Sequence, residues 1–166
     1  MESTRSRHGG ANVRVPPPLV FGAAILAGWC LHRFVFALPV PGGELLRRTL
    51  TATTGLAGLL LILLAHIRFS STGQDPRPWK PSPALIGRGP YRYSRNPMYL
   101  AMVLLVCGVG FALDTLWMVI LAGPALAAVH HTAVLKEEAY LLETFGESYA
   151  DYVARTPRYL GWWRRF

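Results

Sequence analysis

Charged side chains are scarce in this chain of 166 residues. Asp, Glu, Lys and Arg make up 16% of it, hydrophobic residues make up 52%, and the mean hydropathy is +0.29. Soluble domains average about 25% charged residues. The composition therefore favours a membrane protein over a soluble one, and the length allows a single domain.

The chain has only two cysteines, and it lacks the sequence motifs of several enzyme classes. The two cysteines, Cys30 and Cys107, lie inside apolar runs, which excludes a disulfide framework and suits thiols of the core. The chain has no phosphate-binding loop, GxGxxG fingerprint, HExxH pair or nucleophile triad. No cleavable signal peptide is predicted, because the first apolar run begins after residue 18 and is long enough to span a bilayer.

Negative charge is also in short supply, with 9 acidic against 17 basic residues and a net charge of +8. A basic chain can bind nucleic acid, but here the arginines flank apolar runs and do not form a stripe on a soluble fold. We therefore expect anionic lipid headgroups of the bilayer as a partner, and no nucleic acid.

Long apolar runs are abundant by contrast. A hydrocarbon core of ~30 Å needs about 20 helical residues, and residues 19–40 and 50–69 each provide such a run. Arg33 falls inside the first run, and we expect it to lie near one end, where its side chain reaches water. These two runs predict the first two transmembrane helices.

A third apolar stretch, residues 98–131, is too long for one crossing and is interrupted by ALDTL. Asp114 or Thr115 is a natural N-cap there. The pattern predicts a tight helical hairpin, residues 97–113 and 115–135, with a kink at Pro124.

Basic residues in short loops orient membrane proteins, because such loops stay in the cytoplasm. Most basic residues lie in the N-terminal tail, in the segment after the second run and in the C-terminal tail. We therefore predict that both termini and the central loop face the cytoplasm, in a prokaryotic inner membrane. The basic residues on that side are Arg5, Arg7, Arg14, Arg68, Arg77, Lys80, Arg88, Arg92, Arg95, Lys136, Arg155, Arg158, Arg164 and Arg165.

The chain is thus predicted to be one all-α integral membrane domain, residues 1–166, with about four transmembrane helices. A cytoplasmic amphipathic helix follows the hairpin; we expect it to break at Gly146 and to end at Pro157. The expected parts are the tail and first two spans (1–69), a structured cytoplasmic loop rich in proline (70–98), the helical hairpin (98–135) and the cytoplasmic helix and tail (136–166).

Histidine and glutamate recur at a spacing of seven after the hairpin. His130 and Glu137, and likewise His131 and Glu138, share a helix face. One interpretation is a metal site, but two ligands on one face do not complete one, and we predict no metal. The other is a solvated helix face that begins at the water boundary, with Lys136 or another basic neighbour as partner.

Two motifs are more specific because their order and spacing occur together. GPYRYSRNPMYL is followed, after the hairpin, by EEAYLLETFGESYADYVARTPRYL. Over residues 84–157 this arrangement resembles the superfamily of isoprenylcysteine carboxyl methyltransferases and phospholipid methyltransferases, which are integral membrane enzymes. The resemblance implies S-adenosylmethionine as cofactor, bound without a Rossmann domain, and a lipophilic acceptor.

The resemblance also implies roles for residues of this chain. Leu85, Ile86 and Tyr91 would help to hold the cofactor. A carboxylate and tyrosine faces suit its sulfonium and ammonium groups, and its own carboxylate suits Arg95. The main cradle would be Asn96, Pro97, Met98 and Tyr99, with Glu137 across the hairpin.

Two positions depart from the family pattern. Asn96 stands where many relatives have histidine, and Ala133 stands where isoprenylcysteine enzymes carry a substrate-binding arginine. A carboxylate acceptor would need another cation, for which Lys136 or Arg155 is available. An amine or thiol acceptor would need a base, for which we consider Glu147 or Tyr149. Arg155 and Glu147 are therefore our catalytic candidates.

The predicted function is methyl transfer to an isoprenylcysteine-like carboxylate, a lipid amine or another amphiphile. A non-enzymatic membrane scaffold or transport subunit that retains the fold is the alternative, and it predicts no affinity for the cofactor. A basic module that binds the membrane surface would explain the arginines but not the spacing of Asn96, Glu137 and Arg155.

Overall fold

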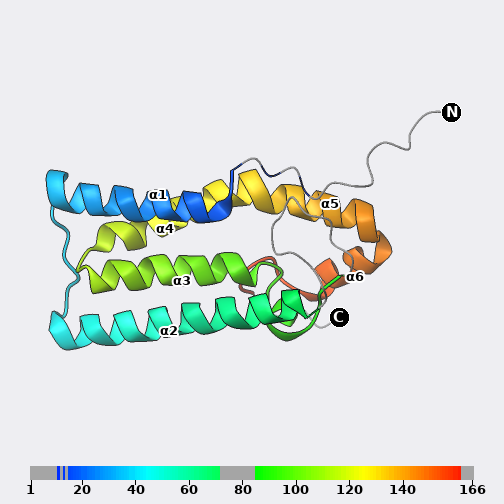
Figure 1. Ribbon diagram of the computed structural model, residues 1–166, viewed down its shortest axis with the longest axis horizontal. Helices are drawn as coiled ribbons and strands as arrows, with labels where there is room; N and C mark the ends of the chain where they lie inside the picture. The colour runs from blue at the N-terminus through cyan, green and yellow to red at the C-terminus, as the bar shows by residue number, and fades with distance from the viewer. Residues whose placement is uncertain (1–10, 12, 14, 72–84, 162–166) are drawn as a thin grey trace.

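A computed structural model of the chain describes residues 11, 13, 15–71 and 85–161, and within these residues all regular structure is helical (Figure 1). The all-α fold that the sequence predicts is confirmed. The elements are α1 (Pro17–Cys30), the π-helical η1 (Leu31–Val35), α2 (Gly43–Ser70), the 3₁₀ turn η2 (Gly89–Arg92), α3 (Pro97–Ala112), α4 (Leu116–Val129), the π-helical η3 (His130–Val134), α5 (Leu135–Phe145) and α6 (Glu147–Arg155).

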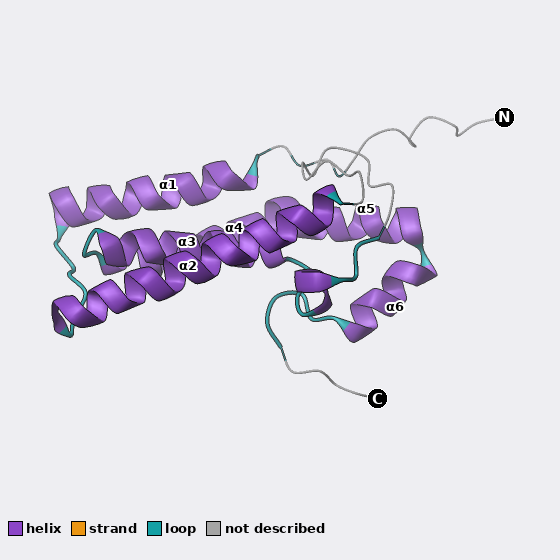
Figure 2. Cartoon of the chain, turned by 60° about the horizontal axis from the view of Figure 1, so that its bottom comes forward, coloured by secondary structure: helices purple, strands orange, loops and turns teal. Residues whose placement is uncertain are grey.

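Helices α1 to α4 lie side by side in an elongated bundle, and α5 and α6 lie at one of its ends (Figures 1 and 2). Helix α3 packs against α2, α4 and α1, and α1 also packs against α4. Among the described residues, three helical stretches are long and apolar enough to cross a membrane: Pro17–Val35, Gly43–Ser70 and Leu116–Phe145. Helix α3 is also apolar but has only 16 residues.

The first span ends earlier than the sequence predicts, at Val35 instead of residue 40. The residues after Val35 leave the helix, because backbone N–H groups of this segment donate to side chains and not to helical carbonyls. The Leu38 N–H donates to His32 Nδ1, and the Val40 N–H donates to Asp114. In return, the Leu38 carbonyl accepts from the Leu116 N–H. These bonds tie the first connection to the turn of the hairpin.

The second span begins earlier than predicted, at Gly43 instead of residue 50. Glu44 lies in its first turn, where the helix dipole favours an acidic side chain, and forms an ion pair with Arg48. Arg47 donates to the carbonyls of Phe111 and Ala112 in the last turn of α3, where carbonyls lack a full set of helical partners. Arg47 and Arg48 thus lie within α2 and not in the connection before it.

The hairpin turn follows the prediction closely. The Thr115 hydroxyl caps α4 by accepting from the Trp117 N–H at 3.2 Å. Asp114 takes the left-handed conformation, with φ 55°, which Asp tolerates better than most residues. Pro124 lies inside α4. The departure from α-helical geometry comes after it, in the five π-helical residues of η3 between α4 and α5.

Small residues allow α2 and α3 to approach closely. A Cβ added at Gly58 would lie 3.1 Å from the Ala101 carbonyl oxygen, and one at Gly108 would lie 3.1 Å from the Gly55 nitrogen. Small residues at helix crossings are the usual means of close packing in membranes. The beginning of α3 is thereby held against the end of α2.

The C-terminal helix breaks where the sequence predicts. Helix α5 ends at Phe145, Gly146 has φ 52°, and α6 runs from Glu147 to Arg155. Of the structured loop predicted for residues 70–98, residues 72–84 lie outside the described residues, and the described part contains η2.

Candidate functional site

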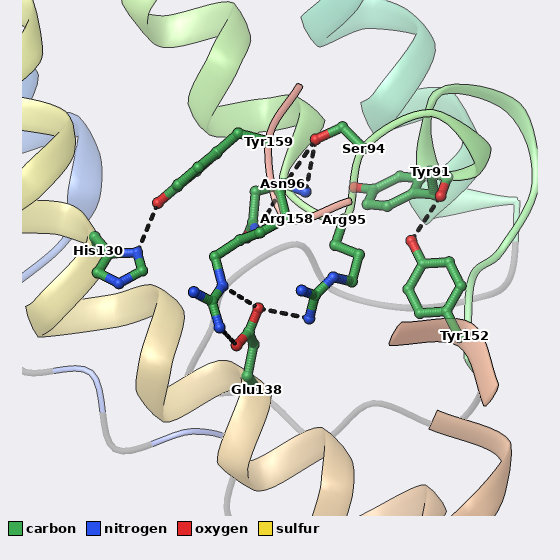
Figure 3. A network of polar contacts seen from close by, with 9 residues as sticks. All are labelled: Tyr91, Ser94, Arg95, Asn96, His130, Glu138, Tyr152, Arg158 and Tyr159. Atoms are coloured by element: carbon green, nitrogen blue, oxygen red, sulfur yellow. Dashed lines mark hydrogen bonds and ion pairs between the residues drawn. The ribbon is translucent and has the colours of Figure 1, made fainter. Parts of the chain in front are cut away.

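Polar side chains gather where α3 begins and where the final long helix passes it (Figure 3). Pro97 is the first residue of α3, and Asn96 before it has a non-helical backbone, with φ −126° and ψ 53°. Proline suits this position because its missing N–H would have no helical acceptor. The sequence Arg95-Asn96-Pro97 therefore places the first two side chains beyond the helix, at the end of the bundle.

Tyr99 and Glu137 connect α3 with α5. The Tyr99 hydroxyl donates to Oε1 of Glu137 at 2.5 Å, where Tyr99 is buried and Glu137 is half-buried. Across residues 15–71 and 85–161, no cationic side chain forms an ion pair with Glu137. Glu137 is therefore a partly enclosed carboxylate with a neutral donor and no cation.

Glu138, the next residue, has the opposite surroundings. Its Oε1 accepts from Arg95 at 2.8 Å and from Arg158 Nε at 2.9 Å, and its Oε2 accepts from Arg158 at 2.7 Å (Figure 3). Two guanidinium groups thus compensate one carboxylate, and the Arg158 pair is bidentate. The partners are distant in sequence, not the adjacent Lys136 that we considered.

The segment 156–159, which we call the C-terminal strap, covers the beginning of α3. The Pro157 carbonyl accepts from the Arg95 N–H at 2.9 Å, and the Arg158 carbonyl accepts from Asn96 Nδ2 at 3.0 Å and from the Ser94 hydroxyl at 3.2 Å. Asn96 and Ser94 are buried. The amide of Asn96 is therefore satisfied by the chain itself.

Tyr91 and Tyr152 join the loop before α3 to α6. The Tyr152 hydroxyl donates to the Tyr91 carbonyl at 2.6 Å (Figure 3). Burial raises the pKa of both phenols, and the negative charge of Glu137 adds to the rise at Tyr91. Both hydroxyls consequently stay protonated at neutral pH.

A pocket of about 790 Å³ lies between the end of α2, the loop before η2 and helix α6. Its charged lining is mostly basic. The residues that line it are Arg68, Ser71, Leu85, Ile86, Gly87, Arg88, Arg92, Ser148, Asp151, Tyr152, Arg155 and Thr156.

The predicted site residues divide between these two places. Tyr91, Arg95, Asn96, Tyr99 and Glu137 belong to the polar cluster at the start of α3. Leu85 and Ile86 line the pocket. Met98 packs beside Ile86 and Tyr91, and Pro97 is buried as the first residue of α3.

The two catalytic candidates lie apart from the polar cluster. Arg155 lines the pocket and forms an exposed ion pair with Asp151 at 3.2 Å. Glu147 is exposed at the start of α6 and does not line the pocket. Their catalytic roles stay predictions, as do the cofactor roles of the other residues.

Two histidines, His130 and His131, lie side by side at the end of α4. His130 Nδ1 and the Tyr159 hydroxyl are 3.1 Å apart, and the His131 ring packs edge-on against His130. Within the described part of the chain, no three His, Cys, Asp or Glu side chains come together as a metal site would require.

Sequence reasoning missed Arg158, Tyr152 and Ser94. In the sequence Arg158 is one of several basic residues of the tail, yet in the structure its side chain pairs with Glu138 and its carbonyl accepts from Asn96. The available signal was its position directly after Pro157, which fixes the backbone before it. Without the fold, nothing in that spacing connects it with Glu138.

Comparison with known proteins gives a family and a relative for this chain. Residues 47–148, more than half of the chain, match the family described as phospholipid methyltransferase. The chain is also 29% identical over 75 residues to the cobalt-zinc-cadmium resistance protein CzcN of Cupriavidus metallidurans, which covers 45% of this chain and 34% of that protein. The chain thus spans about a third of the length of this relative. The family match extends from α2 through α5 and includes Asn96, Tyr99, Glu137 and Glu138, and on this ground the chain belongs to the phospholipid methyltransferase family.

Proposed function

We propose that this protein transfers a methyl group from S-adenosylmethionine to a lipophilic acceptor. The observation that carries the proposal is the contrast between two adjacent carboxylates. Glu138 is neutralised by Arg95 and Arg158, whereas Glu137 has a tyrosine donor and no cation. A partly enclosed carboxylate without a counter-ion suits a positively charged ligand.

The residues present fit this cofactor. Glu137 offers a carboxylate to its ammonium or sulfonium group, and Tyr91 and Tyr99 offer aromatic rings beside that carboxylate. Arg95 Nε is buried and has no hydrogen-bond partner among the residues described, so it can donate to the cofactor's carboxylate. Asn96 Nδ2 is already engaged by the C-terminal strap, so its role would lie in holding the cradle.

When bound, S-adenosylmethionine supplies an electrophilic methyl group on sulfur. The chain's own contribution is positioning and the exclusion of water, which account for much of the catalysis in such displacements. Tyr99 holds the Glu137 carboxylate in place, and Glu138 fixes Arg95 against the start of α3. The apolar helices of the bundle shield this region from one side.

The acceptor is a membrane-soluble amphiphile in this proposal, either an isoprenylcysteine-like carboxylate or a lipid amine. Glu147 and Arg155 are the proposed catalytic residues, as a base and as a cation respectively. We further propose that this end of the bundle and both termini face the cytoplasm of a prokaryotic inner membrane. The basic residues at that end, Arg68, Arg88, Arg95 and Arg158 among them, support this orientation.

A non-enzymatic scaffold or transport subunit is the alternative. The name of the relative also states a part in resistance to cobalt, zinc and cadmium. No three possible metal ligands meet in the described ranges to favour that part here. Affinity for the cofactor separates methyl transfer from both alternatives.

The test is calorimetric binding of S-adenosylmethionine and S-adenosylhomocysteine to the full chain in detergent and in lipid. Wild type should bind, and Glu137→Gln should weaken S-adenosylmethionine binding about tenfold or more, because a charged contact contributes about 1.5–3 kcal/mol. Its effect on S-adenosylhomocysteine should be smaller, since that product lacks the sulfonium charge.

Glu143→Gln provides the matched control, because Glu143 is an exposed glutamate of the same helix. It should leave both affinities unchanged. A folded wild type that binds neither compound would refute the proposed activity. Binding that is equally weakened by Glu143→Gln would refute the special role of Glu137.

A further inference from the structure

The carboxylate of Glu138 is shared unequally between two arginines (Figure 3). Arg158 donates from Nε to Oε1 at 2.9 Å and from a terminal nitrogen to Oε2 at 2.7 Å, so it engages both oxygens. Arg95 donates from one terminal nitrogen, to Oε1 at 2.8 Å. Arg158 therefore forms a bidentate pair with Glu138, and Arg95 forms a single bond.

The single bond leaves part of the Arg95 guanidinium unused. Its Nε is buried and has no hydrogen-bond partner among the residues described. Guanidinium groups pair with carboxylates through two parallel hydrogen bonds where the geometry allows it, and a buried donor without a partner is costly. Arg95 is thus held away from the pairing that would satisfy its Nε.

The bidentate pair of Arg158 accounts for this arrangement. It fixes the orientation of the Glu138 carboxylate and takes Oε2. Without it, Glu138 could turn both oxygens toward Arg95, and the Nε of Arg95 would take one of them. Arg158 therefore keeps that Nε available to a ligand.

The C-terminal strap holds the backbone of Arg158 in place. The Arg158 carbonyl accepts from Asn96 Nδ2 at 3.0 Å, which ties it to the residue before α3. The hydroxyl of the next residue, Tyr159, lies 3.1 Å from Nδ1 of His130 in η3. The side chain of Arg158 consequently projects from a backbone that is anchored on two sides.

A free guanidinium donor suits a carboxylate of the ligand. S-adenosylmethionine carries one carboxylate beside its ammonium and sulfonium groups. The cluster offers Glu137 to the positive groups and the Nε of Arg95 to the carboxylate. The two ends of this cluster thus match the two signs of charge in the amino-acid part of the cofactor.

We propose that Arg158 is a positioning residue of the cofactor site, which selects for the cofactor's carboxylate by keeping the Nε of Arg95 free. Arg158 does not touch the cofactor and acts through Glu138. The inference rests on the proposed function and adds to it the C-terminal strap, which lies outside the residues 47–148 that match the family.

The test is calorimetric titration of the full chain in an uncharged maltoside detergent with two probes. S-adenosylmethionine has the carboxylate, whereas decarboxylated S-adenosylmethionine lacks it and keeps both positive groups. The ratio of the two affinities is the selectivity for the carboxylate. The site variants are Arg158→Gln and Arg158→Lys. Arg48→Gln is the matched control, because Arg48 is an exposed arginine that also pairs with a glutamate.

Wild type should bind S-adenosylmethionine about tenfold or more tightly than the decarboxylated probe, as expected for a contact between charged groups. Arg158→Gln should lower this selectivity about fivefold and leave the affinity for the decarboxylated probe unchanged, because Arg95 then loses its free Nε. Arg158→Lys should resemble Arg158→Gln, since lysine keeps the charge but cannot form the bidentate pair. Arg48→Gln should keep the selectivity of wild type.

A double-mutant cycle tests whether Arg158 acts through Arg95. Arg95→Gln should lower the selectivity the most, and the addition of Arg158→Gln should lower it no further. Glu137→Gln should weaken both probes by similar factors, because it contacts the groups that both probes carry. Losses of selectivity that add in the double variant would contradict the indirect role of Arg158.

Two results would overturn the inference and leave methyl transfer standing. One is equal affinity of wild type for the two probes, and the other is a loss in Arg158→Gln that is the same for both. Full recovery of the selectivity in Arg158→Lys would also overturn it, because charge alone would then suffice. A folded wild type that binds neither probe would refute the proposed activity together with this inference. Thermal unfolding of each variant verifies that it is folded.

Discussion

The hydroxyl of Tyr99 donates a hydrogen bond to the carboxylate of Glu137, 38 positions further along the chain, at 2.5 Å. This bond joins the first turn of α3 to the first turn of α5. It places the only donor that the described residues give to Glu137 on the same helix that begins with Asn96 and Pro97. The two motifs of the family thus meet in one contact.

Removal of that hydroxyl should loosen Glu137 without removing its charge. We expect Tyr99→Phe to weaken binding of S-adenosylmethionine about fivefold, as for the loss of one ordinary hydrogen bond, and so by less than the tenfold or more expected for Glu137→Gln. Calorimetric titration of the two variants side by side measures this order. A larger loss for Tyr99→Phe than for Glu137→Gln would show that the tyrosine binds the ligand directly and does not act through Glu137.

The three members of the Glu138 cluster should differ in their effect on stability. The exposed fractions of the side chains are 10% for Arg95, 16% for Glu138 and 39% for Arg158. Glu138→Gln leaves two cations without their carboxylate, one of them with a side chain only 10% exposed, so it should lower the free energy of unfolding by about 3–5 kcal/mol. Arg158→Gln should cost clearly less, because its side chain is partly in water. Thermal unfolding in detergent ranks the variants, and an equal loss for both would contradict this account.

Close packing of α1 against α4 predicts a contrast between two glycines of α1. A Cβ at Gly28 would lie 2.7 Å from Cγ and 3.0 Å from the backbone nitrogen of Met118, which is fully buried. Gly28→Ala should therefore destabilise the protein by about 1–3 kcal/mol through overpacking. Gly22→Ala is the control, because nothing lies within 4 Å of its added Cβ. A melting temperature that falls equally in both variants would rule out the contact as the cause.

The hydrogen bond between Tyr152 and Tyr91 should make the stability of the protein fall with rising pH in the alkaline range. Burial raises the pKa of Tyr152 above its value in the unfolded chain, about 10. The folded state therefore binds this proton more tightly, so the stabilisation is fully present below pH ~10 and is lost as pH rises beyond it. Melting temperatures of wild type and Tyr152→Phe should differ by a constant amount from pH 6 to 9, and the difference should shrink above pH 10. A difference that grows above pH 10 would contradict the assigned direction.

The apolar runs predicted the helices well because hydrophobic length is a local property of the sequence. The hairpin turn at Thr115 and the break at Gly146 could also be predicted from the sequence. A capping side chain and a glycine with positive φ each depend only on residues close to them in the chain. The ends of the first two spans were not. Val35 and Gly43 are set by bonds from His32 and Asp114 to the connection between them, and one of these partners lies 74 positions away.

The site shows the same division. The spacing of Asn96, Tyr99 and Glu137 within two motifs was visible, and the fold brings these residues together. The pairing of Glu138 with Arg95 and Arg158 was not, because charge alone does not select one arginine among many. The sequence did not predict the basic pocket for a related reason. Arg68 and Arg155 are 87 positions apart, and only the fold brings them to the lining of one pocket.

The C-terminal strap has a consequence for how the protein is made. Ribosomes deliver the chain from its N-terminus, so α1 to α5 emerge while Ser94, Arg95 and Asn96 still lack the carbonyls of residues 157 and 158. The start of α3 can acquire its final bonds only after the last helix has left the ribosome. These bonds therefore form only after α1 to α6 have been synthesised, and a chain cut after Arg155 would leave Ser94, Arg95 and Asn96 without those acceptors.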